Sequence, residues 1–179
     1  MDADRQPIAR LYEGWEGYNR ALIAAVAPRT AGELARRLAP ELRSPGELAR
    51  HVSEGRINWF HRVLGEGSAE LAAEVGALTA GAVEALRDDA DGLVRWLERT
   101  WEMVAGMLAT WTIDDLFATV RHDYRGKTYA LPRQWVLWRI MSHDIHHGGE
   151  LAFSLGAQGI ELPELGGEGG HLTPPPLAS

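Results

Sequence analysis

The chain has no cysteine among its 179 residues. This absence excludes disulfide bonds, thiolate ligands to a metal ion and a cysteine nucleophile. A reaction that needs a nucleophilic sulfur would therefore have to take it from a second substrate. A sequence without disulfides also fits a reducing compartment, and we expect a cytoplasmic protein.

Positive charge is scarce as well. Lys and Arg number 18 against 25 Asp and Glu, which gives a formal net charge of −7 with neutral histidines. Proteins that bind nucleic acids neutralise phosphates with clustered Lys and Arg, and this chain has no basic tract. The charge balance therefore argues against nucleic-acid binding, and equally against binding to anionic membrane surfaces.

Long apolar runs are missing too. No segment approaches the roughly 18 apolar residues that a membrane-spanning helix requires. The N-terminal stretch MDADRQPIAR lacks the apolar run of a signal peptide. We expect no membrane association, and the chain is long enough for one domain with a substantial core.

What the sequence does contain is helical periodicity, with apolar residues recurring at spacings of three and four. From this pattern we predict four long helices, over residues 8–26, 44–64, 80–110 and 132–155. The second has the clearest beginning, because Ser44 can cap it, Pro45 suits the first helical position and Glu47 completes a capping box. Gly65 and Gly67 mark its end.

The spacing of apolar residues changes from a helical to an extended pattern between the third and fourth predicted helices. Phe117, Thr119 and Val120 favour a strand, and Arg125-Gly126 favours a tight turn. An extended pattern resumes after the turn. We predict a small hairpin there.

Four long helices in one chain predict an all-α fold, namely a four-helix bundle. The bundle domain is expected to span residues 8–160, and the Gly- and Pro-rich residues 161–179 to form an irregular tail. Pro28 and Pro40 make the segment after the first helix a connector with at most one short turn of helix. The connectors after the first and second helices are long enough to cross over, so a simple up-and-down order is not required.

Three of the seven histidines lie within five positions, in the stretch MSHDIHHGGEL. His143 and His147 are four residues apart, which places their imidazoles one turn apart on the same side of a helix. Such a pair can ligate one divalent ion. His146 is rotated by about 100° from His147, and we expect it to face a neighbouring helix or water. The same spacing also occurs where both histidines simply belong to the core or the surface.

A third ligand has to come from another helix. His51 lies midway along the second predicted helix, and three histidines would leave a metal ion with open positions for water or substrate. Gly148 and Gly149 each cost a helix about 1 kcal/mol relative to alanine. They indicate either a need for close approach or open space beside the histidines, or simply a helix that is weak at this point. The carboxylates that could orient the imidazole rings are Glu47, Glu54, Asp144 and Glu150.

The other histidines and the tryptophans have simpler interpretations. We expect His61, His122 and His171 to lie at the surface or in ordinary hydrogen bonds. The seven tryptophans are expected in the core.

Two segments together resemble the DinB-like (DinB/YfiT) superfamily, SPGELARHVSEGRINWFHRVLG and WVLWRIMSHDIHHGGELAFSLGAQGI. Members of that family carry a histidine early in the second helix and an H-x-x-x-H pair in the fourth. The likeness spans most of residues 8–160, with the two segments in the right order and separation. Two positions depart from the family pattern, because Gly148 stands where a basic residue is usual and Glu150 stands where glutamine is usual.

The resemblance implies a four-helix bundle of the DinB/YfiT type, in which His51, His143 and His147 hold a divalent metal ion (Ni, Zn, Fe or Mn). It also implies a homodimer. Known activities in the family are mostly those of S-transferases that use low-molecular-weight thiols such as bacillithiol or mycothiol, and one is a thiol-dependent maleylpyruvate isomerase.

On these grounds we predict a thiol-dependent S-transferase, in which a metal-activated small thiol attacks an electrophilic substrate. A free thiol has a pKa of about 8.5, and a divalent cation removes its proton. Glu54 and Glu150 are the candidate catalytic residues, either as proton acceptors or as groups that orient a ligand. Two alternatives stay open: a metal-dependent hydrolase that activates water, and a bundle whose metal acts as a clamp or binds a ligand without catalysis.

Overall fold

The computed structural model describes residues 7–79, 89–162 and 165. This part of the chain is mostly helical and includes one small antiparallel hairpin, as predicted. The elements follow one another as η2 (Ile8–Tyr12), α1 (Glu13–Val26), α2 (Ala31–Ala35), α3 (Pro45–Arg56), η3 (Ile57–Val63), α4 (Ala69–Thr79), α5 (Ala90–Leu108), α6 (Ile113–Phe117), β1 (Thr119–Tyr124), β2 (Lys127–Pro132) and α7 (Arg133–Gly156).

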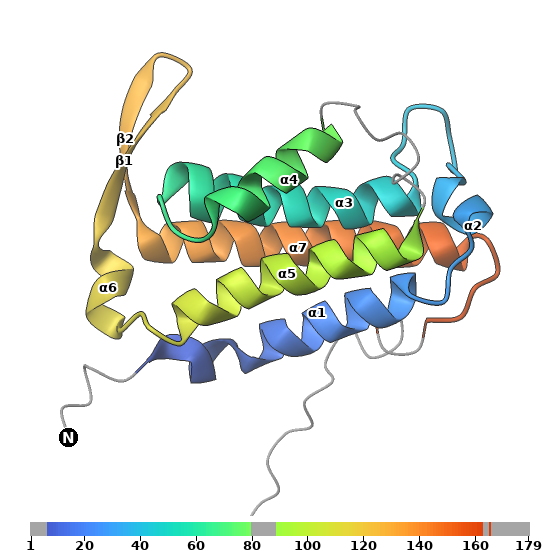
Figure 1. Ribbon diagram of the computed structural model, residues 1–179, viewed down its shortest axis with the longest axis horizontal. Coiled ribbons are helices and arrows are strands. Elements are labelled where there is room, and N and C mark those ends of the chain that lie inside the picture. The colour runs from blue at the N-terminus through green and yellow to red at the C-terminus, as the bar shows by residue number, and fades with distance from the viewer. Residues whose placement is uncertain (1–6, 80–88, 163–164, 166–179) are drawn as a thin grey trace, which may run out of the picture.

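The long helices α1, α3, α5 and α7 lie side by side, with the β1–β2 hairpin projecting from one end and α2 at the other (Figure 1). Both α3 and α1 pack against α5 and α7. Buried apolar side chains fill the space between these helices, among them Leu22, Leu97 and Leu155 towards one end and Phe60, Val104 and Ile140 towards the other. The core thus runs the length of the four helices.

The start of α3 follows the predicted capping box. The Ser44 hydroxyl accepts a hydrogen bond from the Glu47 amide, and the Glu47 carboxylate accepts one from the Ser44 amide. Beyond Arg56 the helix continues in π geometry as η3. It ends where predicted, because Gly65 and Gly67 adopt φ angles of 73° and 80° that favour glycine.

Two helices in the described residues were not predicted. In α4, the Ser68 hydroxyl accepts a hydrogen bond from the Leu71 amide, and Leu71 and Val75 pack in a small cluster with Ile57. The other is α6, described below. The predicted start of the third long helix at residue 80 lies outside the described residues, and α5 begins at Ala90 after the cap Asp89.

The hairpin has the predicted turn but a later start. Arg125 and Gly126 have φ angles of 50° and 72°, and Tyr124 pairs with Lys127 across them. The assignment of Phe117 to a strand is wrong, because a capping box of Thr112 with Asp115 starts α6 and Phe117 is its last residue. As predicted, α7 starts directly after Pro132.

The tryptophans are not all core residues, contrary to prediction. Trp135 and Trp138 on α7 are 42% and 62% exposed, and Ile145 on the same helix is 49% exposed. The packing of α7 against α3 and α1 buries a neighbouring stripe of the helix instead, which consists of Val136, Leu137, Ile140, His143, Asp144, Gly148, Leu151, Ser154 and Leu155. Trp15 and Trp111 do lie in the core, as predicted, and are 3% and 5% exposed.

No helix in the described part of the chain has the length and apolar character needed to cross a membrane. Of the predicted irregular tail, residues 161–179, the structure describes residues 161, 162 and 165. Leu165 is buried against the core.

Candidate metal centre

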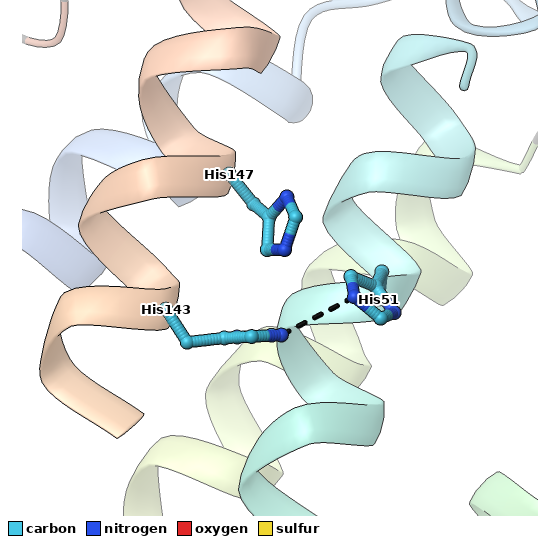
Figure 2. A group of neighbouring side chains, drawn as sticks. All are labelled: His51, His143 and His147. Atoms are coloured by element: carbon cyan, nitrogen blue, oxygen red, sulfur yellow. Dashed lines mark hydrogen bonds between the residues drawn. The ribbon is translucent and has the colours of Figure 1, made fainter. Parts of the chain in front are cut away.

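The three predicted ligands come together where α3 faces α7. The two helices run in opposite directions. Glu66, which follows η3, pairs with Arg133 at the start of α7, whereas His51 in α3 contacts His147 in the second half of α7. Figure 2 shows the His51 ring projecting from α3 towards the rings of His143 and His147 on α7. The ring centroids are 4.8 Å apart for His51 and His143, 4.6 Å for His51 and His147, and 4.5 Å for His143 and His147.

The nitrogen atoms of these rings fit a metal ion. One nitrogen from each of the three histidines lies within 4.8 Å of the other two. Nε2 of His51 and Nε2 of His143 are 3.2 Å apart. Two nitrogens held about 2.0–2.1 Å from a tetrahedral ion would be separated by about 3.3 Å. The three histidines can therefore hold a divalent ion such as zinc or nickel.

The position of the His143 ring depends on Gly55, which the sequence analysis did not single out. A Cβ at residue 55 would lie 2.5 Å from Cε1 of His143, closer than such contacts occur. Gly55 lies four residues after His51, on the same side of α3. This four-residue spacing from the candidate ligand His51 was the feature of the sequence that could have identified Gly55. The glycine lets the Cε1 edge of the His143 ring approach the α3 backbone closely.

Glu150 holds the third ring. Its carboxylate accepts a hydrogen bond from Nδ1 of His147 at 2.7 Å, the arrangement that fixes the orientation of metal-ligating histidines. Burial lowers the pKa of His147 below its ordinary value, the Glu150 hydrogen bond partly opposes this, and the charges of His143 and His51 add to the lowering. The neutral, ligating form of His147 is thereby favoured.

His146 faces water, as expected from its rotation on the helix, although its ring centroid lies 4.8 Å from that of His147. It is 67% exposed on its side chain and its Nε2 lies 3.4 Å from the Glu150 carboxylate. His146, His147 and Glu150 form a second, more exposed group of potential ligands.

The other predicted carboxylates take different positions. Glu54 lies 3.7 Å from Nδ1 of His51 and 3.3 Å from Nε of Arg50. Glu47 does not orient an imidazole in this structure, because it caps α3 and pairs with Arg37.

Asp144 is fully buried directly behind the site. Its Oδ2 accepts hydrogen bonds from Nε of Arg56 and from the indole N–H of Trp15, both at 2.9 Å. Its Oδ1 has no hydrogen-bond partner in the described residues and lies 3.8 Å from Nδ1 of His143, which also has none. These two unpartnered atoms lie close to each other, and the Asp144 carboxylate could orient the His143 imidazole. Arg56, buried in mid-helix, was missed by the sequence analysis.

The structure explains one glycine of the pair next to the histidines, Gly148, but not the other, Gly149. A Cβ at Gly148 would lie 2.2 Å from the Tyr18 hydroxyl, which donates a hydrogen bond to the Ile145 carbonyl at 3.0 Å. Burial, with a smaller contribution from the Asp144 charge, raises the pKa of Tyr18 to about 12 and keeps this donor protonated. A Cβ at Gly149 would meet no heavy atom within 4 Å. Close approach therefore explains Gly148 alone.

The three-histidine cluster opens into a cavity of about 940 Å³ between α3–η3 and α7. Its lining includes all three histidines, His146, Glu54 and Asn58. Glu150 is not among the lining residues. The cavity gives a small molecule access to the point where the imidazole nitrogens converge.

The remaining histidines behave as expected where they are described. Nδ1 of His61 lies 3.1 Å from the Glu66 carbonyl oxygen, and His122 packs against Trp59 and Tyr124. His171 lies outside the described residues.

Comparisons with known proteins identify the fold and the family of the chain. No curated protein matches the chain. The structure is similar to the crystal structure of a DinB-like protein from Bacillus cereus ATCC 10987, with a TM-score of 0.66 and 18% sequence identity over 89% of this chain and 97% of the other. This likeness shows a shared fold. The DinB superfamily matches residues 15–151, which is well over half of the sequence and contains both the α3 and the α7 histidines. The chain therefore belongs to the DinB superfamily.

Proposed function

We propose that the protein is a divalent-metal-dependent S-transferase that joins a small thiol to an electrophilic substrate. The observation that carries the proposal is the convergence of His51, His143 and His147 at the base of an open cavity. The sequence contains no cysteine. The sulfur nucleophile of such a reaction therefore belongs to a cosubstrate.

In this proposal the three histidines hold the ion, which is Ni, Zn, Fe or Mn as the family resemblance implies. A bound divalent ion supplies positive charge that favours the ionised form of a coordinated thiol. Glu150 keeps the His147 ring in its ligating orientation through the 2.7 Å hydrogen bond. Glu54 lines the cavity, and in this proposal its carboxylate takes the thiol proton.

We also propose that α1, α3, α5 and α7 form a DinB-type four-helix bundle within a domain of residues 8–160. The protein acts, in this proposal, as a cytoplasmic homodimer without a nucleic-acid partner. The exposed Trp138, Ile145 and Phe153 on α7 support a dimer contact, because large exposed apolar patches tend to mark interaction surfaces. Sedimentation of the purified protein tests the dimer.

Metal analysis tests the ligands. The purified protein should carry about one divalent ion per chain, and His51→Ala and His147→Ala should each lose it. His122→Ala is the matched control, because His122 packs against Trp59 and Tyr124 outside the cluster. Full metal content in both cluster variants would show that the ligand assignment is wrong.

Addition of a thiol to the cobalt- or nickel-loaded protein tests the chemistry. We expect a thiolate-to-metal absorption band, followed by consumption of an added electrophile. The absence of any thiol effect would overturn the S-transferase. Ester or amide hydrolysis without thiol, abolished by a chelator, would favour the hydrolase instead. A large loss of thermal stability on metal removal, without binding of any thiol, would favour a structural clamp.

A further inference from the structure

The cavity next to the histidine cluster is positively charged, although the whole chain is acidic. Among the described residues, the ionisable lining residues other than histidine are Arg43, Arg62, Arg139 and Glu54. In this part of the lining, three guanidinium groups are accompanied by one carboxylate, in a chain with a net charge of −7. A bound divalent ion would add further positive charge at one end of the same cavity.

Two of the arginines lack a carboxylate partner in the part of the chain that the structure describes. Among the described residues, no Asp or Glu lies within ion-pair distance of Arg62 or Arg139. Glu54, the acidic residue of the lining, is instead close to Arg50 and His51. Arg43 differs, because its charge acts on the Glu150 carboxylate. Arg62 and Arg139 are therefore the cations left for a ligand.

The two arginines lie beyond the histidine cluster, along the groove towards the hairpin. Arg139 precedes His143 by four residues on α7, which is about one helical turn or 5–6 Å along the axis. Arg62 lies on η3, eleven residues after His51. The Arg139 guanidinium lies 5.9 Å from the centroid of the Trp59 ring, which contacts Trp135 in turn. The aromatic ring gives this guanidinium a preferred place at the cavity wall.

From this arrangement we propose that Arg62 and Arg139 bind a carboxylate or phosphate group of the small molecule whose reactive end lies at His51, His143 and His147. The proposal rests on the proposed function, since it names the chemical class of the ligand of the same cavity. A guanidinium presents paired N–H donors that match either oxyanion. The ligand would be an anionic thiol or an anionic electrophile, which extends from the histidines towards arginines that lie about one helical turn away on α7 and about three turns away along α3–η3.

Two thiols of equal length test the charge selection. In the cobalt-loaded protein, the absorption band is titrated with 4-mercaptobutyrate and with its neutral amide. The wild-type protein should bind the acid about tenfold more tightly than the amide. Arg62→Gln and Arg139→Gln should each reduce this ratio, and the double variant should bring it close to one while the amide affinity stays unchanged. Arg95→Gln, which removes an exposed arginine of α5 outside the cavity, should keep the wild-type ratio.

A second titration does not involve thiol chemistry. Succinate, succinamide and inorganic phosphate are titrated into the metal-free protein and followed by calorimetry. Binding of succinate or phosphate to the wild type, with none to the double variant and none of succinamide, would support the anion site even if no thiol band ever forms. The preferred anion would distinguish a carboxylate from a phosphate. If the double variant keeps the preference, or if the wild type shows none in either titration, the anion site is wrong whatever happens to the S-transferase.

Discussion

At the scale of single residues, Gly55 decides where the His143 ring can lie. An added Cβ would be 2.5 Å from Cε1 of that ring, so the imidazole must move away from His51 and His147. We expect Gly55→Ala to weaken binding of zinc or nickel at least tenfold. Competition with a chromophoric chelator measures this affinity directly.

Gly149→Ala is the matched control for that variant. The added Cβ has no heavy atom within 4 Å, so the metal affinity should not change. The variant should raise the free energy of unfolding by roughly 0.5–1 kcal/mol, because alanine is the better helix former. An equal loss of metal affinity in the two variants would contradict the close-packing role of Gly55.

A second residue-scale prediction concerns the buried pair of Arg56 and Asp144, both fully shielded from solvent. Arg56→Met leaves the Asp144 carboxylate without its charged partner, which typically costs about 3–5 kcal/mol when the pair is buried. We expect a loss of this size in urea unfolding. In Arg56→Met/Asp144→Asn the loss should be smaller than the sum of the two single losses. Simple additivity would mean that the ion pair is not coupled.

At the scale of elements, the short helix α6 depends on its cap. Hydrogen bonds from the Thr112 amide and hydroxyl lower the pKa of Asp115 below its ordinary value of 3.8, against a small opposing effect of burial. A lowered folded-state pKa means that this carboxylate contributes stability above its unfolded pKa and loses the contribution as pH falls through the folded one. The contribution is therefore present at neutral pH.

Asp115→Asn tests this contribution. Urea unfolding should show the variant to be less stable than the wild type at pH 7. The difference should shrink as the pH is lowered from about 4, where unfolded Asp side chains become protonated. Thr112→Ala removes the other half of the capping box, and we expect it to cost about 0.5–2 kcal/mol. A difference between Asp115→Asn and the wild type that is constant from pH 7 to pH 3 would exclude the cap as its source.

At the scale of the whole molecule, the site joins helices that are far apart in the sequence. His51 on α3 and His147 on α7 meet across the α3–α7 interface. An ion that binds them in the folded state alone adds stability by mass action, about 2.7 kcal/mol when its free concentration is 100 times its dissociation constant. We expect zinc or nickel to raise the unfolding midpoint of the wild-type protein in a concentration-dependent way.

His51→Ala should abolish that dependence while the metal-free protein still folds, because the His51 side chain is partly exposed. Thermal unfolding with and without added metal gives the comparison. A metal-induced stabilisation that is the same in wild type and variant would place the ion somewhere other than the three-histidine cluster.

Local sequence patterns were sufficient for much of the secondary structure. The Ser44 capping box, the glycines that end η3, the Arg125-Gly126 turn and the start of α7 all depend on residues within a few positions of one another. The short helix α6 was not predicted, because residues that favour a strand, Thr119 and Val120, follow closely after its Thr112 cap. The sequence could also pair His143 with His147, because four residues make one helical turn.

Only the tertiary structure decided which faces and charges meet. It buried Val136 and Ile140 on α7 and exposed Trp138, a choice that helix periodicity cannot make because both stripes are apolar. It placed Gly55 next to the His143 ring and set Arg62 and Arg139, which have no carboxylate partner among the described residues, around one cavity. Contacts of this kind join residues separated by dozens of positions, and they are fixed by how α3 and α7 pack together. The sequence by itself thus determined the helices and the spacing of the ligands, whereas the packing of those helices determined the site.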